Sequence, residues 1–334
     1  MAEGKVVVVT GASAGLGRAI AHAFAKRGCR LALLARNPEA LEASASECVW
    51  MGGEVITIPT DVSDADVVDR AATEVEAKFG PIDIWVNDAM VSVFSPVKAM
   101  SPEDYKRVTE VTYLGCVYGT LSALRRMLPR DRGTIVQIGS ALAYRSIPLQ
   151  SAYCASKHAI NGFTDSLRCE LFHDKSNVRL TTVHMPAMNT PQFDWVKSRL
   201  QNEAQPVPPI YDPEACALVV VEAAYAKHPR REYWLGFPTV KAIVGTKLFP
   251  GLLDRYLGAV GYESQQIQGK PHDPEAPNNL HHYVPGTHSA RGKFDKESRS
   301  GRMEASLTVH RPLVLLGLCA LLAGGVGLLR RRNA

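Results

Sequence analysis

The sequence lacks the residue spacings of a metal site or a disulfide framework. Its seven cysteines are scattered, with no C-x-x-C pair and no histidine at zinc-finger distance, which is typical of reduced thiols in a cytosolic protein. The first residues lead straight into a strand-like run, so no secretory signal is expected. The formal net charge is only +5, and much of the basic excess follows residue 290, which argues against a nucleic-acid partner.

The chain has instead the composition of a large globular domain, with 46% hydrophobic and 21% charged residues. Short, largely apolar runs alternate with longer helical patterns. These runs lie at residues 5–10, 30–35, 54–60, 82–87, 133–140, 179–186 and 231–237. Strands that are apolar throughout are covered on both faces, and the intervening segments are long enough for crossover helices. The sequence therefore predicts an α/β fold, with a doubly wound sheet of seven parallel strands in a single domain over residues 1–262.

Two segments after the sixth predicted strand have a different character. Residues 188–211 contain four prolines and several aromatic residues, and we expect this long excursion to be a lid over a substrate. Residues 263–311 are polar, rich in Pro, Gly and His, and without periodicity. This composition predicts a flexible linker.

The C-terminal residues are apolar. Leu313 to Leu329 is uncharged and would be about 25 Å long as a helix, near the thickness of a bilayer core, and three arginines follow it. We therefore expect residues 312–332 to form a transmembrane or membrane-anchoring helix that holds a cytoplasmic catalytic domain at the membrane; a buried core helix is the alternative. The orientation stays open, because basic residues flank both ends.

A glycine-rich turn joins the first predicted strand to a helix. Glycines let the backbone turn sharply and approach a ligand, and the helix N-terminus offers free N–H groups to a phosphate. The spacing G-x-x-x-G-x-G at this junction predicts a dinucleotide site. The residues expected to bind the cofactor here are Gly11, Ser13, Ala14, Gly15, Leu16 and Gly17.

The end of the second predicted strand bears on the cofactor. Arg36 stands where an acidic residue would bind the ribose of NAD, so there is no carboxylate to repel a 2′-phosphate and a guanidinium is placed to hold it. The sequence favours NADP(H) and leaves NAD(H) as the alternative. Asp61 and Val62, after the third strand, are expected to face the adenine, although an aspartate that begins a turn is an alternative explanation.

Tyr153 and Lys157 are one helical turn apart, so their side chains share one face of a helix, and Ser140 closes the fifth predicted strand. Together with the glycine turn, this set resembles the short-chain dehydrogenase/reductase superfamily over residues 5–240. The resemblance implies a Rossmann-like fold, interconversion of a secondary alcohol and a ketone with a nicotinamide cofactor, and a homodimer or homotetramer.

The chemistry requires these residue types. Tyr153 would exchange the proton, and a positive charge on Lys157 would favour its phenolate. Ser140 would hydrogen-bond the substrate oxygen and stabilise developing charge. The family pattern also implies that Lys157 holds the nicotinamide ribose.

Three stretches of the chain depart from the family pattern. The usual Asn-Asn-Ala-Gly reads Asn87, Asp88, Ala89 and Met90, in which Asn87 and Ala89 are retained as cofactor-binding residues. Thr112 takes the catalytic position of the asparagine that, in the family, connects the lysine to solvent through a helix break and a water. Its hydroxyl could keep the water but cannot reproduce the amide, so its catalytic role is left open. The usual Pro-Gly-x-x-x-Thr becomes a stretch from Pro186 to Thr190, and both of these residues are expected to contact the cofactor.

The substrate pocket is expected to be apolar. We assign Leu142, Tyr144, Phe193 and Trp195 to its wall beside Ser140, which favours a lipophilic ketone or alcohol. Because of Met90 and Thr112, a nucleotide-binding sensor or scaffold with little or no turnover is the alternative function.

Overall fold

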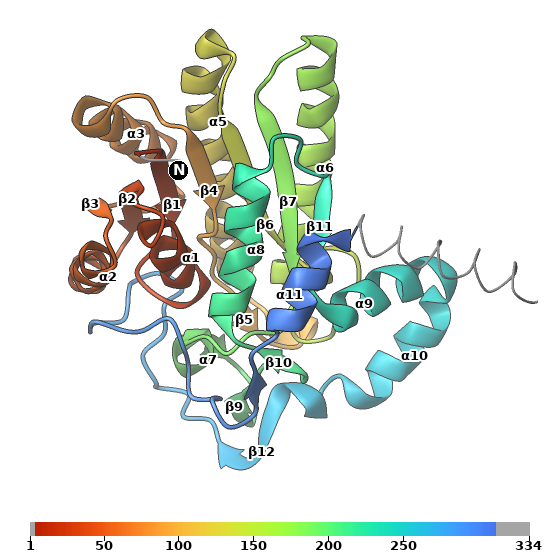
Figure 1. Cartoon of the computed structure of the whole chain (residues 1–334). Helices are drawn as coiled ribbons and strands as arrows, with labels where there is room; N and C mark the ends of the chain where they lie inside the picture. Colours follow the sequence, from red (N-terminus) through yellow and green to blue (C-terminus); the bar gives the residue numbers. More distant parts are fainter. Residues whose placement is uncertain (1–3, 312–334) are drawn as a thin grey trace, which may run out of the picture.

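The computed structural model describes residues 4–311, which form a three-layered α/β fold around one sheet (Figure 1). Every pairing in this sheet is parallel, and the strand order is β11-β7-β6-β4-β1-β2-β3. The strands are β1 (Val6–Thr10), β2 (Arg30–Ala35), β3 (Glu54–Pro59), β4 (Ile84–Asn87), β6 (Thr134–Ser140), β7 (Arg179–Met185) and β11 (Glu232–Trp234). The seven-stranded parallel Rossmann-like sheet predicted from the apolar runs is confirmed.

Helices cover both faces of the sheet, because side chains of each strand alternate between two apolar layers. In β1, Val7 and Val9 belong to one layer, and Val6 and Val8 to the other. The first layer is covered by α1 (Gly15–Ala25), α2 (Pro38–Trp50), α8 (Pro213–Tyr225) and α11 (Arg302–Val309), and the second by α3 (Ala65–Phe79), α5 (Gly115–Met127) and α6 (Ser151–His173). Burial on both faces explains why the strands are apolar throughout.

The strand order reverses between β1 and β4. From β1 the chain proceeds outward to β2 and β3, and then returns to β4 and continues to β6 on the other side. The helices that follow β1 and β4 therefore diverge, and a crevice opens at the carboxyl ends of these two strands. The predicted glycine turn and the Asn87 to Met90 stretch both lie at this crevice.

The expected lid consists of short elements that pair with other parts of the chain. Helix α7 (Gln192–Trp195) is followed by β8 (Lys197–Ser198), which pairs with β5 (Val93–Phe94). Strand β9 (Asn202–Ala204) pairs with β12 (Gln266–Pro271), and β10 (Ile210–Tyr211) pairs with β13 (Ser298–Arg299). Tyr211 at the end of this excursion is fully buried, so the excursion ends in the protein core.

The prediction of a flexible linker at residues 263–311 is wrong for this part of the chain. It contributes β12, β13 and α11, and its polar stretch crosses the open edge of the domain beside α1 and α2 (Figure 1). Leu280 is completely buried and Phe294 nearly so. Two apolar anchors and many backbone hydrogen bonds hold a segment whose composition alone indicates disorder.

Helices α9 (Gly236–Leu248) and α10 (Pro250–Val260) project from the β11 side of the molecule (Figure 1). No residue of α10 is buried. Within residues 4–311, none of the helices combines the length and the apolar character that crossing a bilayer requires. The predicted membrane helix at 312–332 lies outside the described residues.

Candidate active site

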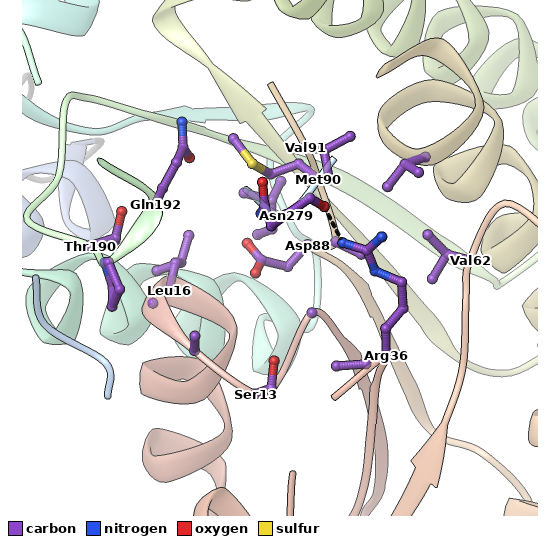
Figure 2. A pocket seen from close by; sticks show the side chains of 18 of the residues that line it. Ser13, Leu16, Arg36, Val62, Asp88, Met90, Val91, Thr190, Gln192 and Asn279 are labelled. Atoms are coloured by element: carbon purple, nitrogen blue, oxygen red, sulfur yellow. Dashed lines mark hydrogen bonds between the residues drawn. The ribbon is translucent and has the colours of Figure 1, made fainter. Parts of the chain in front are cut away.

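A cleft runs along the carboxyl ends of β1, β4, β6 and β7. Most of the residues predicted to bind cofactor or to react line this cleft. They are Gly11, Ser13, Ala14, Gly15, Leu16, Arg36, Asp61, Val62, Ala89, Ser140, Tyr153, Lys157, Pro186, Thr190 and Trp195. Figure 2 shows Ser13 and Leu16 below the cleft, Thr190 and Gln192 at one end, and Arg36 and Val62 at the other.

The glycine turn is as tight as its sequence predicts. Gly11 has φ of +73°, a backbone conformation that side chains disfavour. A Cβ on Gly17 would lie 2.3 Å from the Gly11 carbonyl oxygen, so the turn can close onto α1 only with glycine there. Ala14, which precedes α1, gives no side-chain cap to the helix. Two of the first N–H groups of α1 have partners at the cleft, because Gly15 donates to the Ser289 carbonyl at 3.0 Å and Gly17 donates to the Asp88 carboxyl.

Ser140, Tyr153 and Lys157 meet at one end of the cleft. Ser140 is the last residue of β6, and the other two occupy the first two turns of α6. The Lys157 Nζ lies 5.6 Å from the centre of the Tyr153 ring and donates a hydrogen bond of 2.6 Å to the Ile138 carbonyl. Only 3% of Lys157 is exposed, so its charge acts in a low-dielectric setting where Coulombic effects are strong.

The ionisation of these groups follows from their burial. Burial raises the pKa of Tyr153 well above its usual value, and a contribution from the Ser140 hydroxyl opposes this. Burial lowers the pKa of Lys157, whereas the carboxyl of Asp88 raises it. In the protein without cofactor, Tyr153 is therefore a protonated phenol at neutral pH.

Thr112 occupies a break in the helical path between α4 (Pro102–Val108) and α5. Residues Thr109–Leu114 form a π-helical turn. The Thr112 hydroxyl accepts a hydrogen bond from the Val91 N–H at 3.1 Å and donates one to the Val91 carbonyl at 2.9 Å. The sequence suggested that a hydroxyl could not replace the amide of asparagine. In the structure this hydroxyl makes one donor and one acceptor contact with the same backbone residue, so both groups of Val91 are satisfied.

Some predicted residues lie outside the cleft. Asn87 is buried beneath it, where its amide bonds Thr120 and Gln137 and accepts from Trp85. Its hydrogen bonds join β4 to β6 and α5, and it is not among the residues that line the cleft. Gly17 packs against the Gly11 carbonyl, and the Thr112 hydroxyl bonds the backbone of Val91, which does line the cleft.

Three of the four predicted substrate residues are not part of the cleft lining. Tyr144 donates to Glu232 at 2.6 Å and its ring packs edge-on against His184. Phe193 packs between Phe94 and Phe294. Leu142 is likewise absent from the cleft wall, and only Trp195 lines it. Sequence position relative to Ser140 could not reveal which way these side chains point.

Asp88 is a lining residue that sequence reasoning did not assign. The N–H of Gly17 donates to its carboxyl group, and its Oδ2 is 2.8 Å from where a Cβ on Gly17 would lie. Burial raises the pKa of Asp88 to about 7, although Lys157 and the Gly17 N–H oppose this. Figure 2 shows Asp88 pointing into the cleft near Leu16. The sequence could have indicated this residue, because a carboxyl group stands here where the family pattern has a neutral asparagine.

The C-terminal segment supplies four further lining residues that the sequence did not predict. They are Asn279, Tyr283, Val284 and His288. The Arg36 guanidinium donates to the carbonyls of Asn279 at 2.5 Å and His281 at 3.2 Å. The Gly15 N–H, in the first turn of α1, donates to the Ser289 carbonyl at 3.0 Å. No motif marks such contacts, because the acceptors are backbone atoms.

This architecture defines an α/β oxidoreductase in which a nucleotide-binding turn and a Ser-Tyr-Lys set share one cleft. The profile of the short chain dehydrogenase family matches residues 5–200. The uncharacterized oxidoreductase YxnA of Bacillus subtilis (strain 168) is 33% identical over 318 residues, which cover 95% of this chain and 88% of that protein. The chain therefore belongs to the short-chain dehydrogenase/reductase family.

Other relatives share the catalytic domain. Dehydrogenase/reductase SDR family member 7 of Homo sapiens is 39% identical over 170 residues, which cover 50% of each chain. Among solved structures, an alcohol dehydrogenase of the archaeon Thermococcus sibiricus complexed with 5-hydroxy-NADP has a TM-score of 0.61 at 29% identity and covers 69% of this chain and 94% of its own. An actinorhodin polyketide ketoreductase with NADPH has a TM-score of 0.54 at 29% identity and covers 56% of this chain and 72% of its own.

Proposed function

We propose that this enzyme interconverts a lipophilic ketone and the corresponding secondary alcohol with NADP(H). The observation that carries the proposal is the shared cleft, which has Ser140, Tyr153 and Lys157 at one end and the glycine turn with Arg36 at the other. When bound, the nicotinamide supplies or accepts the hydride. Two similar solved structures, a Thermococcus alcohol dehydrogenase with 5-hydroxy-NADP and a polyketide ketoreductase with NADPH, support the same assignment.

The residues of this chain would divide the remaining chemistry. In the reductive direction, Tyr153 gives its phenolic proton to the substrate oxygen as that oxygen becomes an alcohol. The Ser140 hydroxyl donates to the same oxygen, and the nearby Lys157 ammonium favours the phenolate that remains. The raised pKa of Tyr153 keeps the proton in place until a substrate is present.

The preference for NADP(H) rests on Arg36. No acidic residue stands at the end of β2, and Ser13 adds a hydroxyl on the same side of the cleft. A guanidinium has five N–H donors. Contacts with the Asn279, Leu280 and His281 carbonyls use three of them, so two are left to bind a 2′-phosphate.

The wall of the cleft near Tyr153 favours an apolar substrate. It carries Met90, Val91, Met188 and Trp195. Hydrophobic side chains with few polar groups are typical of pockets for lipophilic molecules. A panel of lipophilic ketones, with consumption of NADPH as the readout, tests this proposal. Reduction of polar sugars but of none of the lipophilic ketones would contradict it.

A second feature that fits a lipophilic substrate is an exposed apolar surface on α9 and α10. Helices α9 and α10 expose large hydrophobic side chains, namely Phe237, Val244, Leu248, Phe249, Leu252, Tyr256 and Val260. Exposed basic residues accompany them at Lys241, Lys247 and Arg255. Gln265, just beyond α10, donates to the carbonyl of Pro148 in the loop after Ser140. We propose that this surface lies on a membrane, from which a lipophilic substrate would enter.

The membrane surface predicts a result in vesicle binding. Replacing Phe249 and Leu252 with aspartate in a chain that ends at residue 311, so that the apolar C-terminal run cannot itself bind vesicles, should reduce sedimentation with phosphatidylcholine–phosphatidylglycerol vesicles by about tenfold or more, because each apolar side chain contributes about 1.5–3 kcal/mol when buried. The control is Leu121→Asp on α5, an exposed leucine outside this surface, which should leave binding unchanged. Equal binding of both variants would contradict the proposed surface.

Asp88 predicts a pH dependence of cofactor binding. Its pKa of about 7 means that the carboxyl is neutral below pH 7 and charged above it. A charged carboxylate at the start of α1 repels a pyrophosphate, so affinity should be highest at low pH and fall as the pH rises. For NADH, which has no titrating 2′-phosphate, we expect the Kd to rise by about three- to thirtyfold between pH 6 and pH 9. For Asp88→Asn, the Kd for NADH should change little over the same pH range. If the wild-type Kd is equally independent of pH, Asp88 does not control cofactor binding.

A further inference from the structure

The segment 279–289 lies across the nucleotide end of the cleft and is held there from outside. Its Leu280 is completely buried, and the Leu280 carbonyl accepts a hydrogen bond of 3.0 Å from Arg107 Nε. The amide of Asn37, itself buried, donates to the carbonyls of Val284 and Gly286 at 3.0 Å each. These contacts fix the segment as part of the domain.

The inner side of this segment contacts the residues that surround the cofactor. The carbonyl of Ser289 accepts from the Gly15 N–H, and that of Thr287 accepts from Arg18 Nη1 at 2.6 Å. His288 packs against Trp195, with ring centroids 4.4 Å apart. The segment therefore touches the glycine turn, the end of β2 and the predicted lid.

Asn279 carries an atom that the protein leaves without a partner. Its side-chain Oδ1 is buried and makes no hydrogen bond, although the residue lines the cleft. The Asn279 backbone is fixed by Arg36, and Figure 2 shows Asn279 between Arg36 and Asp88. A buried, unsatisfied amide oxygen costs about 1–3 kcal/mol, so a ligand with a suitable donor would be favoured here.

We propose that residues 279–289 are a clamp that completes the cofactor site, and that the Asn279 amide hydrogen-bonds the adenine of the bound dinucleotide. An amide offers a donor and an acceptor side by side, which matches the amino group and ring nitrogen of adenine. The backbone carbonyls of residues 279–281 and 289 hold the clamp at the cleft by accepting hydrogen bonds from Arg36 and Gly15, and two Arg36 donors are left free. This inference rests on the proposed function only in requiring a dinucleotide in the cleft.

The first test compares binding of adenosine-containing ligands. Asn279→Ala should weaken the binding of NADPH, NADH and ADP-ribose alike, by about five- to thirtyfold, as measured by calorimetry. It should leave the binding of reduced nicotinamide mononucleotide unchanged, because that ligand has no adenine. The control is His282→Ala, an exposed residue of the same segment that does not line the cleft, which should bind all four ligands as the wild type does. Unchanged or tighter binding by Asn279→Ala would overturn the proposal.

The second test needs no substitution. Hydrogen exchange of the full chain should slow in residues 279–289 and at the glycine turn when NADPH is added, because the clamp closes on its ligand. Faster exchange in 279–289 would mean that the cofactor displaces the segment, which would then be autoinhibitory, and would overturn the clamp. Protection of the glycine turn alone would also overturn it. If both segments are protected but no ketone is reduced, the clamp stands and the proposed function fails.

Discussion

Replacing Tyr153 with phenylalanine is expected to lower kcat for ketone reduction by about 10²–10⁴-fold, which is the usual contribution of a positioned general acid. The phenol is the group in the cleft placed next to both Ser140 and Lys157, and its raised pKa makes it a proton donor at neutral pH. Phenylalanine fills the same space, so the Kd for NADPH should change by less than about threefold.

The matched control for this substitution is Tyr144→Phe. Tyr144 lies in the same region, but its hydroxyl bonds Glu232 and its side chain is not part of the cleft wall. We expect its kcat to stay near that of the wild type. A Tyr153→Phe enzyme with more than a tenth of wild-type kcat, measured with saturating NADPH, would show that another group delivers the proton.

Replacing Arg36 with leucine is expected to weaken NADPH binding far more than NADH binding. Loss of one partner of a charge-assisted pair costs about 2–5 kcal/mol, so the Kd for NADPH should rise by about 30-fold or more. Arg36 also holds the Asn279 carbonyl, so both cofactors lose any stabilisation that the clamp provides. The ratio of the Kd for NADPH to the Kd for NADH therefore measures the contribution of the 2′-phosphate alone.

A lysine at position 36 is the matched variant. Lysine keeps the positive charge but lacks the planar guanidinium whose N–H groups donate to the carbonyls of residues 279–281. Arg36→Lys should therefore retain part of the preference for NADPH over NADH. A ratio of dissociation constants that stays the same in wild type, Arg36→Leu and Arg36→Lys would contradict the assignment of Arg36 to the 2′-phosphate.

The central sheet could be predicted because each of its strands is marked by a short stretch of consecutive residues. Each strand is an apolar run covered on both faces, and each is separated from the next by a segment long enough for a crossover helix. Ser140 and Tyr153 could be placed together for a related reason. One ends a strand and the other begins the helix that follows, so the topology of a parallel sheet brings both to the same edge.

The C-terminal segment could not be predicted, because its stabilisation has no side-chain pattern. Arg18, Arg36 and Arg107 each bind backbone carbonyls of residues 279–289, and a carbonyl is the same in every residue. Leu280 is the one apolar anchor in this stretch that is fully buried. A segment held in this way has the composition of a linker.

The substrate wall was only partly predictable for a different reason. Tyr144 and Trp195 are both aromatic residues that the sequence assigned to the substrate wall, but Tyr144 bonds Glu232 of β11 and only Trp195 lines the cleft. Thr112 shows a different limit. Its substitution for asparagine raised the alternative of little or no turnover, and that alternative stays a prediction. What the sequence did not reveal is that the Thr112 hydroxyl, in a π-helical turn, bonds both polar groups of Val91.

The central claim is that Ser140, Tyr153 and Lys157 act on a lipophilic ketone beside a bound NADPH. The most direct measurement uses NADPH deuterated at both C4 positions, a panel of lipophilic ketones, and mass spectrometry of the products. The account predicts an alcohol with one deuterium on its carbinol carbon from the wild type, formed at least about a hundredfold more slowly by Tyr153→Phe. Tight binding of NADPH with no deuterated alcohol from any ketone would contradict it and would favour a nucleotide-binding sensor.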